Sequence, residues 1–430
     1  MPTSLRGIAN RAKREPDAIF GDLYRLLNED NLKLCFKRLR KTAAAGVDRV
    51  TYEAYASELD ANISDLVDRL KRKVYHAKLV RRKTIPKGGG KVRHLGIPAL
   101  EDKLLQRAVA DILGAIWEGD FLDCSWGYRP WRAGRAASLE LRESLQRGRS
   151  HWVVEADITG FFDHLDHDWL ERMLRLRIND SALVRLIRKW LRAGILEEDG
   201  RVLHPATGTP QGGIISPMLA NIYLHYALDL WFEKVVKIRC TGRAGMIRYA
   251  DDFVCAFEHE SEARACLDAL RTRLGKFGLE LAEEKTRLVR FSKYDDGNNG
   301  SFEFLGFAFH WEKSRNGYPV VKRRTSPSRL RQSLRKLTKW LKENRHGPLR
   351  VLMKRLNAKL RGYWNYYGVV GNYRSLAKFF YLAKRLLFKW LNRRSQRRSY
   401  RWSGFTRMCA NLGLASPRIT EFVKQPTLFP

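Results

Sequence analysis

The sequence predicts an α+β protein in three parts: a helical N-terminal region, a mixed region of strands and helices, and a basic helical C-terminal region. The chain has 430 residues, which is too long for a single hydrophobic core. Apolar residues recur with both the strand period and the helix period between residues 81 and 312, but only with the helix period after about residue 328. We therefore expect domains at residues 1–80, 81–312 and 313–430.

The charge balance separates the C-terminal region from the rest. The sequence has 81 Lys and Arg against 46 Asp and Glu, which gives a formal net charge of +35. Residues 313–430 contribute 30 of the basic side chains but only two of the acidic ones, Glu343 and Glu421. Because a solvated surface normally mixes both signs, this imbalance is typical of proteins that bind the phosphates of nucleic acid.

The remaining composition indicates an intracellular protein. No two of the six cysteines have the two-residue spacing that zinc sites favour, so we expect reduced, structural thiols. The sequence has neither an apolar run long enough to cross a membrane nor the apolar core of a signal peptide. We expect a cytoplasmic protein that associates with nucleic acid and has no membrane partner.

The N-terminal region reads as packed helices, and a basic hairpin follows it. The helical stripe in the first region is formed by Leu59, Ile63, Leu66 and Leu70. Residues 81–97 predict two strands joined by a glycine-rich turn. Lys87 and Arg93 on this hairpin could neutralise a triphosphate, because glycines let the backbone approach it closely. A solvated hairpin without a ligand is the alternative.

The first acidic motif of the mixed region follows a predicted strand. The alternation over residues 151–158 places Asp157 at the end of the strand, facing away from the core. We expect the next helix to begin near Asp166 or Asp168, with Glu171 in a capping box. The later elements predicted are a glycine-containing loop at 209–213, a helix from about Ser216 to Phe232, a helix over 260–277, a return to the sheet over 279–291 and one strand over 302–309.

The second acidic motif is a hairpin with Asp251 and Asp252 at its tip. Apolar runs on both sides of Tyr249–Asp252 predict two short strands and a tight turn. Asp is itself a turn residue, so the pair alone could be structural. Asp157 on a nearby strand alters that interpretation, because close carboxylates repel one another unless a hard divalent cation lies between them.

We therefore expect Asp157, Asp251 and Asp252 to hold two Mg²⁺ ions, with Mn²⁺ as a possible substitute. Two such ions ~4 Å apart would activate a primer 3′-hydroxyl and stabilise the departing pyrophosphate. This chemistry indicates a nucleotidyltransferase that works along a nucleic acid.

The C-terminal region predicts a linker and three amphipathic helices. Residues 313–328 are rich in Lys, Arg, Ser, Pro and Gly. The apolar stripes of the helices are Leu330 to Leu341, Leu349 to Leu360 and Leu376 to Leu391. Between the second and third helices, cations and aromatics suit phosphate contacts and base stacking, although a structural aromatic cluster is the alternative. The residues concerned are Arg361, Tyr363, Trp364, Tyr366 and Tyr367.

These motifs, in this order, resemble those of the reverse transcriptases that group II introns encode, which are also maturases. The resemblance spans nearly the whole chain and rests on an ordered set of short strings. They are AGVD at 45–48, IPKGGGKVRHLGIP at 85–98, SWGYRP at 125–130, ADITGFFDHLDH at 156–167, TPQGG at 209–213, YADD at 249–252, FLGF at 304–307 and RGYWNYY at 361–367. The family implies a right-hand polymerase with fingers, an antiparallel palm sheet and an α-helical thumb and maturase domain.

The resemblance also implies roles for individual residues. Asp157, Asp251 and Asp252 are similar to the catalytic, metal-binding triad, and Phe162 resembles the aromatic residue that lies under the incoming sugar. The implied substrate-binding residues are Lys87, Arg93, Phe162, Gln211 and Lys285, and the implied primer grip is Leu305, Gly306 and Phe307.

Some positions depart from the family pattern. Thr159 stands where Lys is frequent, Trp131 stands where Gly is common, and the hairpin has three glycines where an Asp-Gly pair is usual. None of these changes removes a catalytic group. About 35 residues follow the third helix without a Cys/His cluster, so we expect the form that lacks a C-terminal endonuclease domain.

The implied function is an RNA-directed DNA polymerase that also binds structured group II intron RNA and assists its splicing and mobility. Its partners would be an RNA template, a DNA or RNA primer, dNTPs and the intron RNA. Two alternatives stay open: a free-standing relative that acts in DNA repair or phage defence, and an RNA-binding splicing maturase with a vestigial polymerase.

Overall fold

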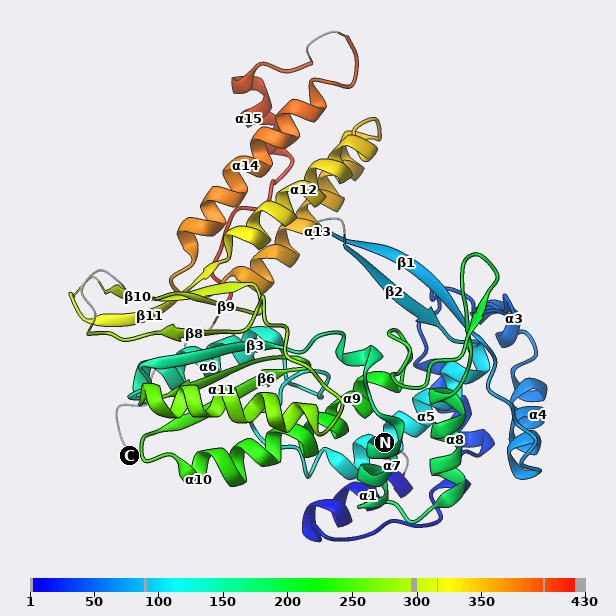
Figure 1. The fold of residues 1–430 in the computed structure, drawn as a ribbon. Helices are drawn as coiled ribbons and strands as arrows, with labels where there is room; N and C mark the ends of the chain where they lie inside the picture. Colours follow the sequence, from blue (N-terminus) through cyan, green and yellow to red (C-terminus); the bar gives the residue numbers. More distant parts are fainter. Residues whose placement is uncertain (1–2, 89–90, 295–299, 315, 397–398, 422–430) are drawn as a thin grey trace.

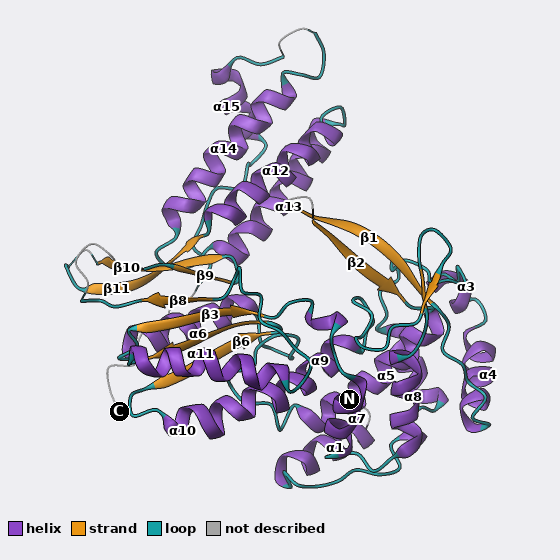
Figure 2. Cartoon of the chain, in the orientation of Figure 1, coloured by secondary structure: helices purple, strands orange, loops and turns teal. Residues whose placement is uncertain are grey.

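The computed structural model describes residues 3–88, 91–294, 300–314, 316–396 and 399–421. A central sheet is flanked by helices, and a long hairpin and a helical bundle extend from this body on the same side (Figure 1). The strands are concentrated in the projecting hairpin and at the foot of the bundle, and helices flank the central sheet (Figure 2). None of the helices in the described ranges combines the length and apolar character needed to span a membrane.

The N-terminal region is helical, as predicted. Ile63, Leu66 and Leu70 of the predicted stripe are almost fully buried, and Leu59 is partly buried against the same core. Two of these helices, α1 and α2, pack on α5, whose buried residues are mostly apolar. The helices are α1 (Thr3–Arg14), α2 (Glu29–Lys37), α3 (Tyr52–Ala56), α4 (Leu59–Lys71) and α5 (Leu100–Trp117), with a 3-10 turn at Tyr24–Leu26.

The predicted basic hairpin is present. Strand β1 (Val80–Gly88) pairs antiparallel with β2 (Lys91–Ile97). On its other side β1 pairs with β4 (Ile195–Leu196), which in turn pairs with β5 (Val202–Leu203). The side chain of Lys87 lies outside the described part of the structure, so its predicted phosphate contact stays a prediction.

The central sheet has the strand order β6-β7-β3-β8, and every neighbouring pair is antiparallel. One face packs on α11 and the core of the N-terminal half, and the other packs on α6 and a second sheet. Both faces of β3 are therefore buried. The prediction assumed that only one face of this strand packs on a core, and that assumption was wrong. The elements are β3 (Trp152–Asp157), β6 (Ala244–Tyr249), β7 (Asp252–Phe257), β8 (Arg287–Arg290), α6 (Gly134–Arg147) and α11 (Glu260–Gly275).

The second sheet corrects two predictions. Residues 302–309 form two strands rather than one, because Leu305 and Gly306 adopt positive φ angles of 52° and 80° and turn the chain. The predicted linker at 313–328 contains a strand that completes this sheet. The strands, in the spatial order β11-β10-β9, are β9 (Phe302–Phe304), β10 (Phe307–Lys313) and β11 (Pro319–Thr325).

Three further predictions in the mixed region need correction. The next helix begins beside Asp166, one of the two predicted starts, but the capping box of Asp168 with Glu171 was wrong, because the carboxylate of Asp166 accepts the backbone N–H groups of Asp168 and Trp169. Only residues 287–290 of the predicted return at 279–291 form a strand. The helix predicted to end at Phe232 continues to Arg239 through π-helical turns. These elements are η2 (Phe161–Asp163), α7 (His167–Arg175), α8 (Ser181–Leu191), α9 (Ser216–Leu224), η3 (His225–Asp229), η4 (Phe232–Val236) and α10 (Lys237–Arg239).

The C-terminal bundle contains the three predicted helices, and Leu337, Leu341, Leu356 and Leu387 from their stripes are buried in its core. The aromatic run Arg361–Tyr367 forms the last two turns of the second helix instead of a connection. A further helix follows the three. The helices are α12 (Pro327–Asn344), α13 (Leu349–Tyr367), α14 (Tyr373–Leu391) and α15 (Trp402–Asn411).

Candidate active site

The three predicted acids lie at one end of the central sheet. Asp157 is the last residue of β3 and stands opposite Asp252, the first residue of β7. Asp251 lies in the two-residue turn between β6 and β7. The antiparallel register therefore brings together side chains that are about a hundred positions apart in the sequence.

The electrostatics of Asp252 reflect this proximity. Burial, and then the charges of Asp157 and Asp251, raise the pKa of Asp252 to about 7. Lys285 offsets part of the negative charge, because its ammonium group contacts the carboxylate of Asp157.

The side chains of Asp157, Asp251 and Asp252 are chemically suited to bind a divalent cation, because carboxylate oxygens are the ligands that Mg²⁺ prefers. Their present arrangement is not that of a finished metal site: within the described ranges, no three His, Cys, Asp or Glu side chains are grouped to hold an ion. Lys285 occupies one carboxylate oxygen of Asp157 and so competes with a metal ion for that oxygen.

The raised pKa of Asp252 predicts pH-dependent metal binding. The carboxyl is protonated below about pH 7 and ionised above it, and only the ionised form can ligate a cation. We expect the affinity for Mn²⁺ to fall up to about tenfold for each pH unit below 7. Calorimetric titration between pH 6 and 8 measures this effect, and the Asp252→Asn variant should lack it. Equal affinities of the native protein at pH 6 and pH 8 would contradict the prediction.

A pocket of about 270 Å³ adjoins the acids. Several predicted substrate-binding residues converge on it from separate elements. Its lining includes Arg93, Asp157, Phe162, Gln211, Asp251 and Lys285.

Backbone contacts hold the walls of this pocket together. The amide of Gly96 in β2 donates to the carbonyl of Gln211 (2.8 Å), and the amide of Thr209 donates to the carbonyl of Phe162 (2.7 Å). Gly212 has a φ of 120° and lies so close to Gly96 that a Cβ atom would overlap the Gly96 carbonyl. Gly212 thus allows the 209–213 loop to pack closely against the backbone of the hairpin.

Backbone strain is concentrated around the acidic turn. Ala250 has a φ of 59°, which L side chains rarely adopt. Of the seven non-glycine residues with positive φ in the described chain, four lie in this turn or in segments that contact it. They are Tyr128, Trp131, Ala250 and Leu305. Such strain persists only where the surroundings impose it, and it is typical of functional sites.

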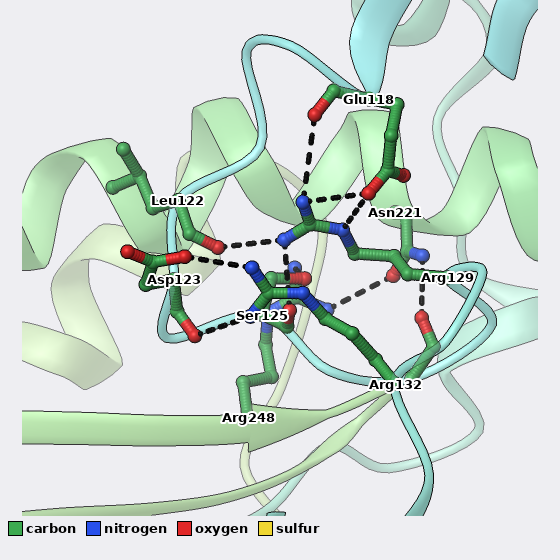
Figure 3. Close-up of polar contacts among 9 residues, drawn as sticks. Glu118, Leu122, Asp123, Ser125, Arg129, Arg132, Asn221 and Arg248 are labelled. Carbon is green, nitrogen blue, oxygen red and sulfur yellow. Dashed lines mark hydrogen bonds and ion pairs between the residues drawn. The ribbon is translucent and has the colours of Figure 1, made fainter.

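A buried arginine imposes part of this geometry. Arg248, one residue before the acidic-turn segment Tyr249–Asp252, is completely buried and forms an ion pair with the equally buried Asp229 (2.5 Å). Its guanidinium also donates to the carbonyl of Ala250 (3.0 Å) and to side-chain oxygens of Ser125 and Asn221 (2.7 and 3.2 Å). Figure 3 shows Arg248 beside the loop that carries Ser125 and Arg129.

The loop at residues 124–127 makes further contacts with Arg248, Asn221 and the acidic turn. The backbone of Arg248 exchanges hydrogen bonds with Cys124 and Trp126 (2.8 Å each), and Asn221 donates to the carbonyl of Gly127 (2.7 Å). A Cβ atom at Gly127 would overlap the backbone nitrogen of Ala250, so the loop and the turn are in direct contact.

Sequence reasoning missed Arg248, Asp229 and Asn221. The available signal was a charged residue inside the apolar strand run 246–257, since a buried charge requires a partner.

The predicted primer grip lies at the turn between β9 and β10. The hydroxyl of Tyr366 donates to the carbonyl of Leu305 (2.8 Å), which fixes the turn to helix α13. Phe307 is fully buried and stacks on Tyr366 with ring centroids 5.6 Å apart. Phe307 is therefore part of the packing beneath the turn on the protein side, whereas Leu305 and Gly306 form the tip of the turn.

The prediction of base stacking by the aromatics of 361–367 was wrong for Trp364, which is fully buried. Tyr363 stacks on Phe379 with ring centroids 3.8 Å apart, and Tyr366 and Tyr367 pack on the second sheet. The alternative, a structural aromatic cluster, is what the structure shows. The helical period explains the outcome, since these rings share the inward face of α13, whereas Arg361 is exposed.

Two family profiles match the chain. Residues 85–309 match "Reverse transcriptase (RNA-dependent DNA polymerase)", and residues 330–408 match "Group II intron, maturase-specific domain".

Two known proteins and one solved structure are similar to the chain. The group II intron-encoded protein LtrA of Lactococcus lactis subsp. cremoris is 29% identical over 88% of this chain and 76% of its own length. Protein YkfC of Escherichia coli (strain K12) is 31% identical over 73% of this chain and 89% of its own length. Among solved structures, telomerase from Candida albicans with a fragment of telomeric RNA matches 84% of this chain and 67% of that one, with 13% identity and a TM-score of 0.44.

Proposed function

Because the chain belongs to the reverse transcriptase family and carries a group II intron maturase-specific domain, we propose that it copies RNA into DNA and binds structured group II intron RNA. The observation that carries the proposal is the register of the central sheet, which sets Asp157 opposite Asp252 and beside the Asp251 turn. The central sheet is then the palm and the hairpin β1–β2 belongs to the fingers. Helices α12 to α15 form the thumb and maturase domain, which therefore begins after β11 rather than at residue 313, and the helices before β1 form an N-terminal extension.

We further propose that Asp157, Asp251 and Asp252 are ligands of two Mg²⁺ ions, which the divalent metal dependence of the family supports. When bound, these ions supply the electrostatic stabilisation that phosphoryl transfer needs. Arg93 neutralises the phosphates of the incoming dNTP from the hairpin side of the pocket. Phe162 offers a wall that a ribose 2′-hydroxyl would meet.

Primer extension by the full-length protein tests the polymerase. A DNA primer annealed to an RNA template should be extended with dNTPs and Mg²⁺, and a chelator should stop the reaction. Extension without a template, or no extension on any template, would refute the proposal. A splicing assay with a group II intron RNA tests the maturase part separately.

The basic bundle offers a surface for RNA. A groove of about 1080 Å³ between α12, α14 and α15 is lined by apolar residues and basic ones. The basic lining residues are Arg335, Lys339, Lys342, Arg385 and Lys389. Glu421, one of the two acidic residues in 313–430, does not neutralise these basic side chains. Its carboxylate instead pairs with the buried Arg323 (2.6 Å).

Neutralising this groove is expected to weaken RNA binding mainly at low salt. The Gln variants of Arg335, Lys339 and Arg385, combined, should make the slope of log affinity against log salt shallower by about 2, because fewer counterions are released. Filter binding at several salt concentrations measures the slope. Gln substitution of the exposed basic residues 71–73 at the end of α4 is the control. A slope equal to that of the native protein would show that the RNA lies elsewhere.

A further inference from the structure

The loop before α6 contains a tryptophan in an unusual backbone position. The amide of Arg132 donates to the carbonyl of Arg129 (3.4 Å), which closes a four-residue turn with Pro130 second and Trp131 third. Trp131 has a φ of 63°. Proline in the second position and positive φ in the third are typical of a type II turn, which favours glycine where Trp131 stands.

Packing within the chain does not explain this tryptophan. The relative exposure of Trp131 is 101%, so the whole indole ring is in solvent. A bulky residue at positive φ is strained, and an exposed indole gains nothing from burial. The sequence therefore keeps a costly residue at a position where glycine would be favourable.

The turn is also held firmly in place. Arg129 donates to the carboxylate of Glu118 (2.8 Å) and to the carbonyls of Leu122 and Ser125 (2.8 and 2.9 Å). Arg132 donates to the backbone and the carboxylate of Asp123 (3.0 and 2.6 Å). Both guanidinium groups point back into the protein (Figure 3). The two arginines are thus used internally and fix the turn that presents Trp131.

The loop connects the two turns that define the proposed path of the primer end. Gly127, at its start, touches Ala250 of the acidic turn. Gly134, at its end, lies so that a Cβ atom would be 3.6 Å from both Leu305 and Tyr249. A nucleic-acid strand that extends from Asp251 to the turn at Leu305 would therefore pass close to this loop.

We propose that Trp131 is a stacking platform for an unpaired base of the nucleic acid bound at the active site. The inference rests on the proposed function, which places nucleic acid there. The net charge of +35 concentrates polyanions near the surface. An exposed indole on a rigid turn offers a flat face on which any base can stack, without requiring a particular sequence. The base could belong to the template overhang or to the primer end.

The Trp131→Gly variant separates this role from a structural one. Glycine relieves the strain, so the thermal midpoint should be equal to or higher than that of the native protein. Affinity for a primer–template with a single-stranded overhang, measured in EDTA so that no synthesis occurs, should fall about tenfold. The salt slope should stay unchanged, because stacking releases no counterions. Trp131→Phe should retain most of the affinity. The control is Tyr318→Ala, since Tyr318 is also largely exposed (71%) but stands on the β10–β11 connection.

A fluorescent base identifies which strand is bound. With 2-aminopurine at successive overhang positions or at the primer end, the native protein should change the emission at one position, and Trp131→Gly should abolish that change. A signal in the overhang assigns the template, and a signal at the primer end assigns the primer. Equal affinity and equal emission for the native and Trp131→Gly proteins would overturn the proposal, and so would a lower thermal midpoint of the variant. If the native protein bound no primer–template at all, the proposed polymerase function itself would fail.

Discussion

Replacing Asp251 with asparagine is expected to lower the rate of Mg²⁺-dependent primer extension by about 10³-fold or more, while RNA affinity stays nearly unchanged. The side chain lies in the hairpin turn at the sheet end, beside Asp157 and Asp252. An amide has almost the same shape but no charge, so the electrostatic stabilisation of the transition state is lost. A loss of several kcal/mol corresponds to about three orders of magnitude in rate.

Single-turnover extension with saturating dNTP measures this loss, and filter binding measures RNA affinity. Asp268→Asn is a matched control, because Asp268 is exposed on α11, away from the acidic turn. Extension by Asp251→Asn at the native rate would exclude the metal role of this residue. The same variant also tests the alternative of a vestigial polymerase: if native and variant proteins splice an intron equally well but neither extends a primer, the chain is a maturase only.

The meeting of the three acids could be predicted from local patterns. The alternation in β3 identifies Asp157 as a strand end, and the two apolar runs around Asp251 identify a hairpin. Both signals extend over fewer than about ten residues, the range over which strand patterns are informative. The antiparallel pairing of β3 with β7 then brings the strand end to the hairpin.

The errors arose where one pattern allows two structures. The run at 302–309 has apolar residues on both sides of Leu305 and Gly306, so the pattern did not reveal that these two residues turn the chain. The aromatic run at 361–367 looked like a nucleic-acid surface because its composition is mixed. Helical geometry instead turns Trp364 inward.

The hydrogen-bond partners of Arg248 could not be predicted, because they come from separate segments of the chain. Ser125 lies in a loop, Asn221 in α9, and Asp229 at the end of the π-helical turn η3. A π-helical turn changes which side chains face inward, and sequence periodicity does not register it. Only the folded chain shows that these groups converge on the guanidinium of Arg248, which in turn donates to the carbonyl of Ala250.

Exchanging the buried ion pair for apolar residues is expected to restore stability without restoring activity. The single variant Arg248→Met leaves the carboxylate of Asp229 buried and unpaired, which costs about 3–5 kcal/mol. The double variant Arg248→Met with Asp229→Leu removes both charges and should recover most of that loss, because an apolar pair of similar volume is tolerated. The carbonyl of Ala250 nevertheless loses its donor. The acidic turn is then less well fixed, and a displacement of about 1 Å is enough to lower the extension rate about 10²-fold.

Urea unfolding and single-turnover extension of the single and double variants separate the two effects. The control is the pair Arg177 and Asp120, which is similarly buried but joins the N-terminal helices to the segment after α7. The same exchange there should leave the rate unchanged once stability is recovered. If the double variant at Arg248 recovered both stability and rate, the ion pair would serve packing alone. Recovery of stability with a persistent loss of rate would identify Arg248 as a positioning residue, which acts on Asp251 through the backbone of the turn rather than through contact with substrate.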